Sequence, residues 1–376
     1  MTIDKRNPDG GFGASRLSIL HVGPGYGQRG GIASVLMELA EHRERFVEHG
    51  IFLAFFETHG FQRIGSALRF VTLDLARFAM ALRTIDVVQF HVSERGSFYR
   101  KWMLSWLAML MRKRVVFHLH SGNFGRFASQ SDRLTRASIR WFVGHADAVI
   151  GVSGSGAVIL NRFRAGVEEA RVIGNTASAA QRDACRLSIS RPHASRPYIA
   201  FAGRLSRQKG LDTLIEALAR LVKQGCDVHL QLAGDGDVDG WRDYAVGLGV
   251  AERVHFTGWL DEAGKARLYR EASVFCLPSQ FEAFGIAALE AMFYGVPVVA
   301  SRVGGLCDLV DDGVTGHLVD PDNAVALADS LRLLMSDAER RTRMGAAGRD
   351  RACRLYAVEV VTAQYVDCYR GITGHA

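Results

Sequence analysis

Short apolar runs recur along the first half of the chain, with segments of helical periodicity between them. Four runs have the length and composition of buried strands, at residues 17–22, 87–91, 114–118 and 148–152. A glycine-rich loop after the first run ends at Gly30-Gly31, and a helix is expected from about Ile32 to Arg45. Strands that alternate with helices predict a parallel sheet with crossover connections.

A second series of the same kind follows a change in composition. Residues 186–197 hold two of the seven prolines and are interpreted as a linker. Strands are then expected at 198–202, 228–232, 254–256, 273–277, 296–300 and 316–319, and the last helices from about 323 to 370. The pattern predicts an α/β protein with two doubly wound, Rossmann-like domains, at 17–185 and 198–355, after a flexible tail at 1–16. In such domains ligands bind beyond the carboxyl ends of the strands.

Composition places the chain among soluble globular proteins. Of its 376 residues 23% are charged and 48% hydrophobic. The six cysteines form no Cys-x-x-Cys pair, so neither a zinc site nor a disulfide framework is expected, and reduced cysteines fit the cytoplasm. The longest apolar run, Trp102–Met111, is about half a membrane span. We therefore expect neither a signal peptide nor a transmembrane helix.

The charge is distributed unevenly. Residues 1–200 carry 27 Lys/Arg against 15 Asp/Glu, whereas residues 201–376 carry 19 against 24. A basic half attracts anionic partners, and without a nucleic-acid-binding motif we favour anionic lipid or a lipid-diphosphate acceptor over nucleic acid. An ordinary arginine-rich surface explains the charge equally well. The segments Tyr99-Arg100-Lys101 and Arg112-Lys113-Arg114 flank Trp102–Met111 and suit an interfacial helix, but a core helix with basic ends is favoured.

The segment Gly203-Arg204-Leu205-Ser206-Arg207-Gln208-Lys209-Gly210 follows an expected strand and precedes a helix. Gly203 lets the backbone turn, and Arg204 and Lys209 are two cations on one loop. A guanidinium fork and an ammonium point charge suit a diphosphate. The alternative is a solvated basic loop, which a second phosphate-suited loop downstream makes less attractive.

That second loop lies between Glu282 and Glu290. On one helix these carboxylates would be about 12 Å apart, whereas a retaining glycosidase needs about 5–5.5 Å. They are therefore interpreted as acceptors for separate parts of an extended ligand, not as an acid/base pair. The backbone N–H groups of Phe284, Gly285, Ile286 and Ala287 open the helix between them and favour an anion such as phosphate.

Other glycine-containing turns are weaker candidates for donor contacts. Gly234-Asp235-Gly236 and Gly258 end two expected strands, where either a plain turn or the wall of a nucleotide pocket fits. Gly30-Gly31 permits close backbone approach to a ligand, or is merely a turn.

Histidines mark the end of a strand in the first half. His118 and His120 are two residues apart on a strand, so their side chains point to the same side. His120, at the strand end, is the candidate for contact with a ligand. His118 fits a satisfied, partly buried histidine, and His91 is a weaker candidate at another strand end. Zinc would need further ligands, and none is spaced along the chain to supply them, so no metal site is expected.

Taken in order, Arg204 to Lys209, Gly234 to Gly236 and Glu282-x7-Glu290 resemble family 4 of the retaining glycosyltransferases, which have the GT-B fold. The resemblance covers nearly the whole chain. The segments Phe281-Glu282-Ala283-Phe284-Gly285 and 295–305 are its most specific parts, and His118-Leu119-His120-Ser121-Gly122 is similar to a strand end of bacterial polysaccharide transferases. Asn175 matches a family asparagine but is followed by Thr176, where the family often has Gly, so no role is assigned to it.

The resemblance implies a role for each matching residue. Arg204, Lys209 and the N–H groups at 284–287 would bind the donor diphosphate, Glu282 the sugar, Glu290 the ribose, and His120 the transferred hexose. The first domain would bind the acceptor, and a helix at about 356–376 would pack back on it.

The resemblance also implies a hexosyltransferase that retains anomeric configuration, without metal or cofactor, in exopolysaccharide, capsule or O-antigen synthesis. The donor would be linked to UDP or GDP, and the acceptor would be a saccharide, lipid-diphosphate-linked, at the inner face of the plasma membrane. A sugar-nucleotide 2-epimerase of the same fold and a non-enzymatic assembly scaffold are the alternatives.

Overall fold

The computed structural model describes residues 16–25, 28, 30–58, 70–164, 168–177, 179–181 and 197–374. The chain divides into two compact units. Unit 1 comprises residues 1–175 and 358–376, and unit 2 comprises residues 176–357. Apart from Arg16 and Pro197, the expected tail and linker lie outside the described residues. No helix within the described ranges combines the length and the apolar character needed to cross a membrane.

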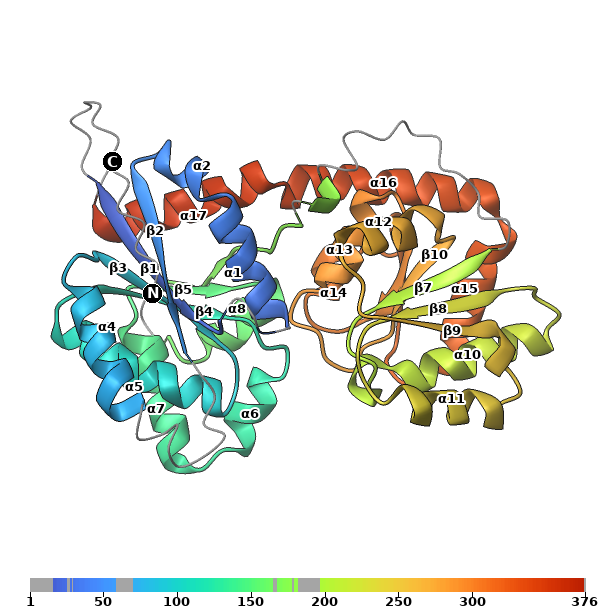
Figure 1. Ribbon diagram of the computed structural model, residues 1–376, viewed down its shortest axis with the longest axis horizontal. Helices are drawn as coiled ribbons and strands as arrows, with labels where there is room; N and C mark the ends of the chain where they lie inside the picture. Colours follow the sequence, from blue (N-terminus) through green and yellow to red (C-terminus); the bar gives the residue numbers. More distant parts are fainter. Residues whose placement is uncertain are drawn as a thin grey trace. The chain divides into compact units, whose positions relative to one another are not determined.

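Unit 1 is built on a parallel sheet of six strands in the order β2-β1-β3-β4-β5-β6. Its elements are β1 (Leu17–Gly23), α1 (Gly31–Glu41), α2 (Arg43–Val47), β2 (Ile51–Glu57), the π-helical turn η1 (Phe70–Asp74), α4 (Leu75–Leu82), β3 (Val87–Val92), α5 (Gly96–Leu110), β4 (Arg114–Leu119), α6 (Phe124–Gln130), α7 (Arg133–His145), β5 (Ala148–Gly151), α8 (Gly154–Asn161), β6 (Arg171–Val172) and α17 (Val358–Thr373). In Figure 1, α4, α5 and α7 cover one face of this sheet and α1 and α17 the other.

Unit 2 repeats the architecture with the strand order β12-β11-β10-β7-β8-β9. Its elements are β7 (Tyr198–Ala202), η2 (Arg207–Lys209), α10 (Leu211–Lys223), β8 (His229–Ala233), α11 (Val238–Gly247), η3 (Ala251–Arg253), β9 (Val254–Gly258), α12 (Glu262–Glu271), β10 (Val274–Leu277), α13 (Ile286–Phe293), β11 (Val298–Ser301), α14 (Leu306–Leu309), β12 (Gly316–Val319), α15 (Ala324–Ser336) and α16 (Ala338–Tyr356). The prediction of two doubly wound parallel sheets is confirmed.

The two faces of the unit 1 sheet differ in chemistry. In β4 the side chains of Val115, Phe117 and Leu119 point into an aromatic core with α5 and α7. By strand alternation His118 points to the opposite face, where Tyr369 of α17 is also buried. An ion pair from Arg45 to Glu359, 2.8 Å long, links α17 to α2. The histidine-bearing face is therefore closed by the C-terminal helix.

The strand β2 was not expected, although its sequence Ile51-Phe52-Leu53-Ala54-Phe55-Phe56 is apolar. It pairs with β1 along the full length of both strands. Burial does not alternate along this edge strand, because four consecutive positions, 53–56, are all partly buried and all apolar. The period-2 pattern of a half-buried strand is therefore missing.

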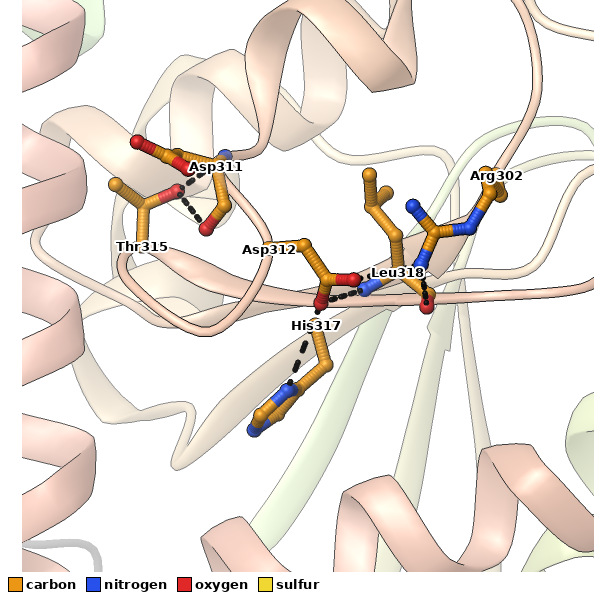
Figure 2. Close-up of polar contacts among 6 residues, drawn as sticks. All are labelled: Arg302, Asp311, Asp312, Thr315, His317 and Leu318. Carbon is orange, nitrogen blue, oxygen red and sulfur yellow. Dashed lines mark hydrogen bonds and ion pairs between the residues drawn. The ribbon is translucent and has the colours of Figure 1, made fainter.

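A polar network fixes the turn before β12 (Figure 2). The Asp312 carboxylate accepts hydrogen bonds from the Leu318 N–H at 3.0 Å and from Arg302 at 2.6 Å, and the Thr315 hydroxyl accepts from the Asp311 N–H at 2.9 Å. Burial raises the pKa of Asp312, but the Leu318 and Arg302 hydrogen bonds outweigh it, so the net shift is downward. The contacts join the turn to Arg302, which follows β11, and to Leu318 of β12, and we interpret the network as structural.

Candidate functional site

Three loops of unit 2 meet at the carboxyl edge of its sheet. The Gly203 N–H donates to the Ala233 carbonyl at 2.9 Å, the Leu205 N–H to the Asp235 carbonyl at 2.8 Å, and the Gly234 N–H to the Gly258 carbonyl at 2.8 Å. These bonds hold the turns after β7, β8 and β9 side by side. The structure thus brings together the glycines that the sequence singled out at 203, 234, 236 and 258.

Glycine at position 234 has a packing reason. Gly234 has φ 145°, and a Cβ there would lie 1.8 Å from the Gly203 carbonyl oxygen. Gly210, with φ 70°, ends the short helix η2, and a Cβ there would lie 1.9 Å from the Pro278 oxygen. Only glycine allows these backbones to approach. The close approach of the loops alone therefore explains Gly234, with or without a ligand.

Lys209 and Glu282 form the central ion pair of this edge. The Lys209 Nζ donates to the Glu282 Oε2 at 2.5 Å, although 73 residues separate the two in sequence. Their side chains are 25% and 14% exposed, respectively. The charges are thus largely desolvated, and removal of either would leave its partner poorly compensated.

The backbone around Glu282 is held by the glycine pair after β11. The Gly305 N–H donates to the Glu282 carbonyl at 3.2 Å. A Cβ at Gly304, which has φ 48°, would lie 1.8 Å from the same oxygen. In the sequence, this glycine pair is recognisable only as part of the family motif. Its role as a support for Glu282 appears only in the structure.

Arg204 lies beyond the end of β7 and is exposed. It forms no ion pair with any other described residue. It therefore differs from Lys209, which shares its loop but is already paired with a carboxylate. An unpaired guanidinium at the loop surface can accept an anionic ligand without first giving up a partner.

The start of α13 presents backbone donors. Gly285 precedes the helix with φ 102°, and no side chain caps its N–H groups. The first turn holds no acidic residue that would compete with an anion. Phe284 is 2% exposed and packs on Tyr356, so only its backbone is available to a ligand. Ile286 and Ala287, at the first turn, are partly exposed.

Glu290 lies on the same helix but has other partners. Its Oε1 accepts from the Lys265 Nζ at 2.5 Å, and its Oε2 accepts from the Tyr269 hydroxyl at 2.6 Å. Burial, followed by the adjacent Glu290 charge, raises the pKa of Tyr269 well above its usual value. Sequence reasoning missed Lys265 and Tyr269. Their i, i+4 spacing places both residues on one face of α12. The sequence pattern, however, does not indicate that this face contacts α13.

Unit 1 contributes the remaining candidates. Gly30 precedes α1 and Gly31 begins it, and a Cβ on either would meet no atom within 4 Å. Packing against described residues therefore does not require glycine at either position, in contrast to Gly234. Gly30 has φ 147°, a backbone conformation that itself favours glycine, so either a turn or the close approach of a ligand fits Gly30-Gly31.

His120 ends a hydrogen-bonded set of histidines. The His91 Nδ1 lies 2.9 Å from the His120 Nε2, and the His91 Nε2 lies 2.9 Å from the His21 Nδ1. Burial lowers the pKa of His21 and of His120 to about 3. Burial, and then the neighbouring His120, also lowers the pKa values of His91 and His118. All four rings are therefore neutral at pH 7.

The expectation that no further metal ligand lies near His118 and His120 is wrong. One ring nitrogen each from His91, His118 and His120 lies within 4.8 Å of the others. Strand pairing brings His91 opposite His118, 27 residues away in the chain. Spacing along the sequence does not reveal this, because the ligands come from neighbouring strands.

Lys101 also departs from expectation. The sequence places Lys101 at the basic end of a helix, yet its side chain is only 2% exposed. Its Nζ donates to the Ser97 hydroxyl at 2.7 Å. Burial, followed by the nearby Arg100 charge, lowers the pKa of Lys101 to about 7.

Two family models match successive parts of the chain. The model described as "Glycosyltransferase Family 4" matches residues 29–179, and the one described as "Glycosyl transferases group 1" matches residues 188–351. Together they extend over both units.

Individual relatives agree with the family models. A phosphatidyl-myo-inositol mannosyltransferase of Mycobacterium leprae is 39% identical over 176 residues, which are 46% of each chain. A glycogen synthase of Mycobacterium tuberculosis is 31% identical over 275 residues, 70% of this chain and 66% of that protein. The chain matches about half the length of the mannosyltransferases.

Solved structures agree on the fold. HepE of Anabaena, in complex with UDP and glucose, has a TM-score of 0.74 at 21% identity, with 95% of this chain and 100% of that chain covered. A sucrose-phosphate synthase from Thermosynechococcus elongatus has a TM-score of 0.74 at 21% identity, with 96% and 100% covered. The expected GT-B fold is confirmed.

Proposed function

Because the chain belongs to family 4 of the glycosyltransferases, we propose that it transfers a hexose from a UDP- or GDP-linked donor to a saccharide hydroxyl, with retention of configuration. The observation that carries the proposal is the Lys209–Glu282 ion pair in the same segment as the uncapped start of α13. A desolvated cation and free backbone donors suit a diphosphate.

The proposed mechanism is electrostatic. Cleavage of the anomeric C–O bond leaves negative charge on the departing diphosphate. Arg204, Lys209 and the N–H groups of Phe284 to Ala287 would stabilise that charge, and because they are fixed before the reaction they need little reorganisation. The leaving phosphate would accept the proton of the acceptor hydroxyl, on the same face of the sugar. No protein nucleophile is needed.

The carboxylates divide the recognition of the donor. Glu282 uses Oε2 to orient Lys209, and its Oε1 has no hydrogen bond to another described residue, so it can accept from a sugar hydroxyl. Each oxygen of Glu290 already accepts one hydrogen bond and has a second lone pair for a ribose hydroxyl. Lys265 and Tyr269 would then hold Glu290 in place. His120, a neutral ring, is our proposed contact to the transferred hexose.

The transfer is proposed to need no metal ion. The sequence Asp235-Gly236-Asp237 is the nearest match to a metal-binding Asp-x-Asp, but the Asp237 side chain caps α11 by accepting from the Gly240 N–H at 3.0 Å. Asp237 is therefore occupied as a helix cap. The fixed cations Arg204 and Lys209 would take the place of a divalent ion.

The acceptor is proposed to be a lipid-diphosphate-linked saccharide of an exopolysaccharide, capsule or O-antigen, reached at the inner face of the plasma membrane. The surface of α5 and α7 supports this. Trp106 is 50% exposed and stacks on Trp141 at 3.9 Å, and Leu110 is 80% exposed. Exposed arginines lie on the same helix α7, at 133, 136 and 140. Aromatic and basic residues together suit an anionic lipid interface.

The experiment incubates purified protein with UDP- and GDP-hexoses, with and without a lipid-linked saccharide acceptor, in EDTA. We expect acceptor-dependent release of nucleoside diphosphate and a product with the donor's anomeric configuration. Release of a free epimerised sugar without acceptor would instead indicate an epimerase. Absence of any turnover or saturable nucleotide binding would favour a scaffold.

A further inference from the structure

The histidine cluster of unit 1 has the arrangement of a metal-binding site. His118 and His120 lie two residues apart on one strand and point to the same side, and His91 is the register partner of His118 on the next strand. One nitrogen of each ring lies within 4.8 Å of the other two. Three imidazoles with a free fourth position are a known zinc ligand set.

One nitrogen of the cluster has no partner. His118 is 0% exposed, and its Nε2 makes no hydrogen bond to any residue in the described part of the chain. A buried polar atom without a partner is costly and rare. A metal ion bound to this nitrogen would satisfy it. The same ion would replace the contact of 2.9 Å between the His91 Nδ1 and the His120 Nε2.

The opposite nitrogens of two rings are already held. The His118 Nδ1 lies 3.0 Å from the Gln89 amide, and the His91 Nε2 lies 2.9 Å from the His21 Nδ1. Gln89 in turn contacts the Tyr369 hydroxyl at 2.7 Å. Metal-binding histidines commonly have such second partners, which fix the ring and its tautomer. The assignment of oxygen and nitrogen in an amide follows the network, so Gln89 can turn its oxygen to the His118 N–H.

We propose that unit 1 binds one Zn²⁺ through the His91 Nδ1, the His118 Nε2 and the His120 Nε2, with water as the fourth ligand. Nitrogen ligands about 2.0–2.1 Å from a tetrahedral zinc ion are about 3.3 Å apart, so His91 and His120 need to separate by only a few tenths of an ångström. His118 moves further, by rotation of its ring. An all-imidazole set favours zinc over Mg²⁺ and Ca²⁺, which prefer oxygen.

Lys101 is a buried positive group whose charge acts on both His91 and His120. A protonated Lys101 opposes a dication. With a pKa of about 7, its ammonium group can release its proton when the ion binds. The ion would tie β3 to β4. It would take up the His120 Nε2 and leave the Nδ1 of that ring for the proposed contact to the hexose. The zinc proposal rests on the arrangement of the three rings and not on the proposed function.

The test uses the full-length protein, freed of metal by a chelator and titrated with Co²⁺. We expect one equivalent to bind, with the visible absorption of four-coordinate cobalt, and Zn²⁺ to displace it. The variants His91→Gln and His118→Gln should lose this absorption. His229→Gln is the matched control, because it breaks another histidine pair, 3.1 Å apart in unit 2, and should bind like the parent. His21→Phe should weaken binding about 10- to 100-fold, as expected for a second partner.

Failure of the parent protein to bind one equivalent of Co²⁺ or Zn²⁺ would overturn the proposal. So would undiminished binding by folded His91→Gln or His118→Gln. X-ray absorption of the zinc-loaded parent tests the ligands without any variant. It should show imidazole nitrogen neighbours and no sulfur. Sulfur in the first shell would place the ion on the free cysteines instead.

Discussion

Units 1 and 2 share a six-stranded parallel sheet, but their polar residues are arranged differently. Unit 2 concentrates ionised groups in the loops at its carboxyl edge and in the helices that follow them, where Lys209 pairs with Glu282 and Lys265 with Glu290. Unit 1 instead buries neutral imidazoles on one face of its sheet and closes that face with α17. One architecture thus supports a charged edge and an uncharged polar interior.

The difference follows from solvation. A loop at a sheet edge keeps partial access to water, so its side chains stay charged and can form ion pairs with an anionic ligand. On a buried sheet face the cost of desolvation removes the charge from a histidine. The charged edge of unit 2 therefore suits donor binding and catalysis. The interior of unit 1 suits hydrogen bonding or metal ligation.

The largest expected effect is a loss of stability at acidic pH in unit 1 and not in unit 2. Folding lowers the pKa of His21 and of His120 from 6.5 to about 3. Between these values the unfolded chain binds more protons, so stability is lost as the pH falls below 6.5. The slope is about 1.4 kcal/mol per pH unit for each such histidine. Hydrogen exchange at pH 5 and 7.5, corrected for intrinsic rates, should show loss of protection in β1, β3 and β4 and little change in β7, β8 and β10.

His21→Phe provides the control for this acid effect, since it removes one buried histidine and keeps an apolar ring beside Phe55. The change in its stability with pH should be smaller by the contribution of one histidine, about 1.4 kcal/mol per pH unit. Equal pH dependence in both units would contradict the comparison.

Next in size is Lys209→Ala. The variant removes a cation from the proposed diphosphate site and leaves Glu282, 14% exposed, without its partner. Hydrogen bonds to charged groups contribute about 1.5–3 kcal/mol, so turnover should fall about 10- to 100-fold or more. Steady-state kinetics of transfer measure it, and Lys223→Ala, at the end of α10, serves as the exposed control. Unchanged turnover would remove Lys209 from the catalytic assignment.

Arg204→Ala should cost on the order of 10- to 100-fold in kcat/KM through the same charge effect, without disturbing an ion pair. Arg207→Ala is the matched comparison, because Arg207 is an exposed arginine of the same loop. Arg207→Ala should act nearly like the parent enzyme. If the two variants lose activity equally, the loop acts as a general positive surface rather than through Arg204.

The smallest effect concerns donor affinity. Glu290→Ala should raise the apparent KM for donor more than Glu282→Ala does, because Glu290 is assigned to the ribose and Glu282 to the sugar. Tyr269→Phe removes one of the two hydrogen bonds to Glu290 and should raise the KM by a smaller factor. Initial rates at varied donor concentration measure all three. A larger KM for Glu282→Ala would reverse the assignment.

The charged edge could be predicted largely from the sequence because its parts are local. Gly203, Arg204 and Lys209 occupy one loop, and Glu282 to Glu290 one helix start. What the sequence could not supply was the pairing between loops. The Lys209–Glu282 contact and the Gly304–Gly305 support depend on which strands are neighbours in the sheet.

The histidine cluster could not be assembled from spacing alone. His21, His91 and His118 come from three strands, and their contacts follow from the order β1-β3-β4. The buried Lys101 was missed for a similar reason. The polar run Tyr99-Arg100-Lys101 suggests an exposed helix end, but Lys101 lies on the buried face of α5.

The central claim, that unit 2 binds a nucleoside diphosphate through Lys209 and the start of α13, is tested most directly by calorimetry. Purified protein in EDTA is titrated with UDP, GDP and ADP, in parallel with Lys209→Ala. We predict saturable binding of UDP or GDP at one site per chain, without metal, and at least 10-fold weaker binding by the variant. Absence of saturable binding by all three nucleotides, or equal affinity of the variant, would contradict the account.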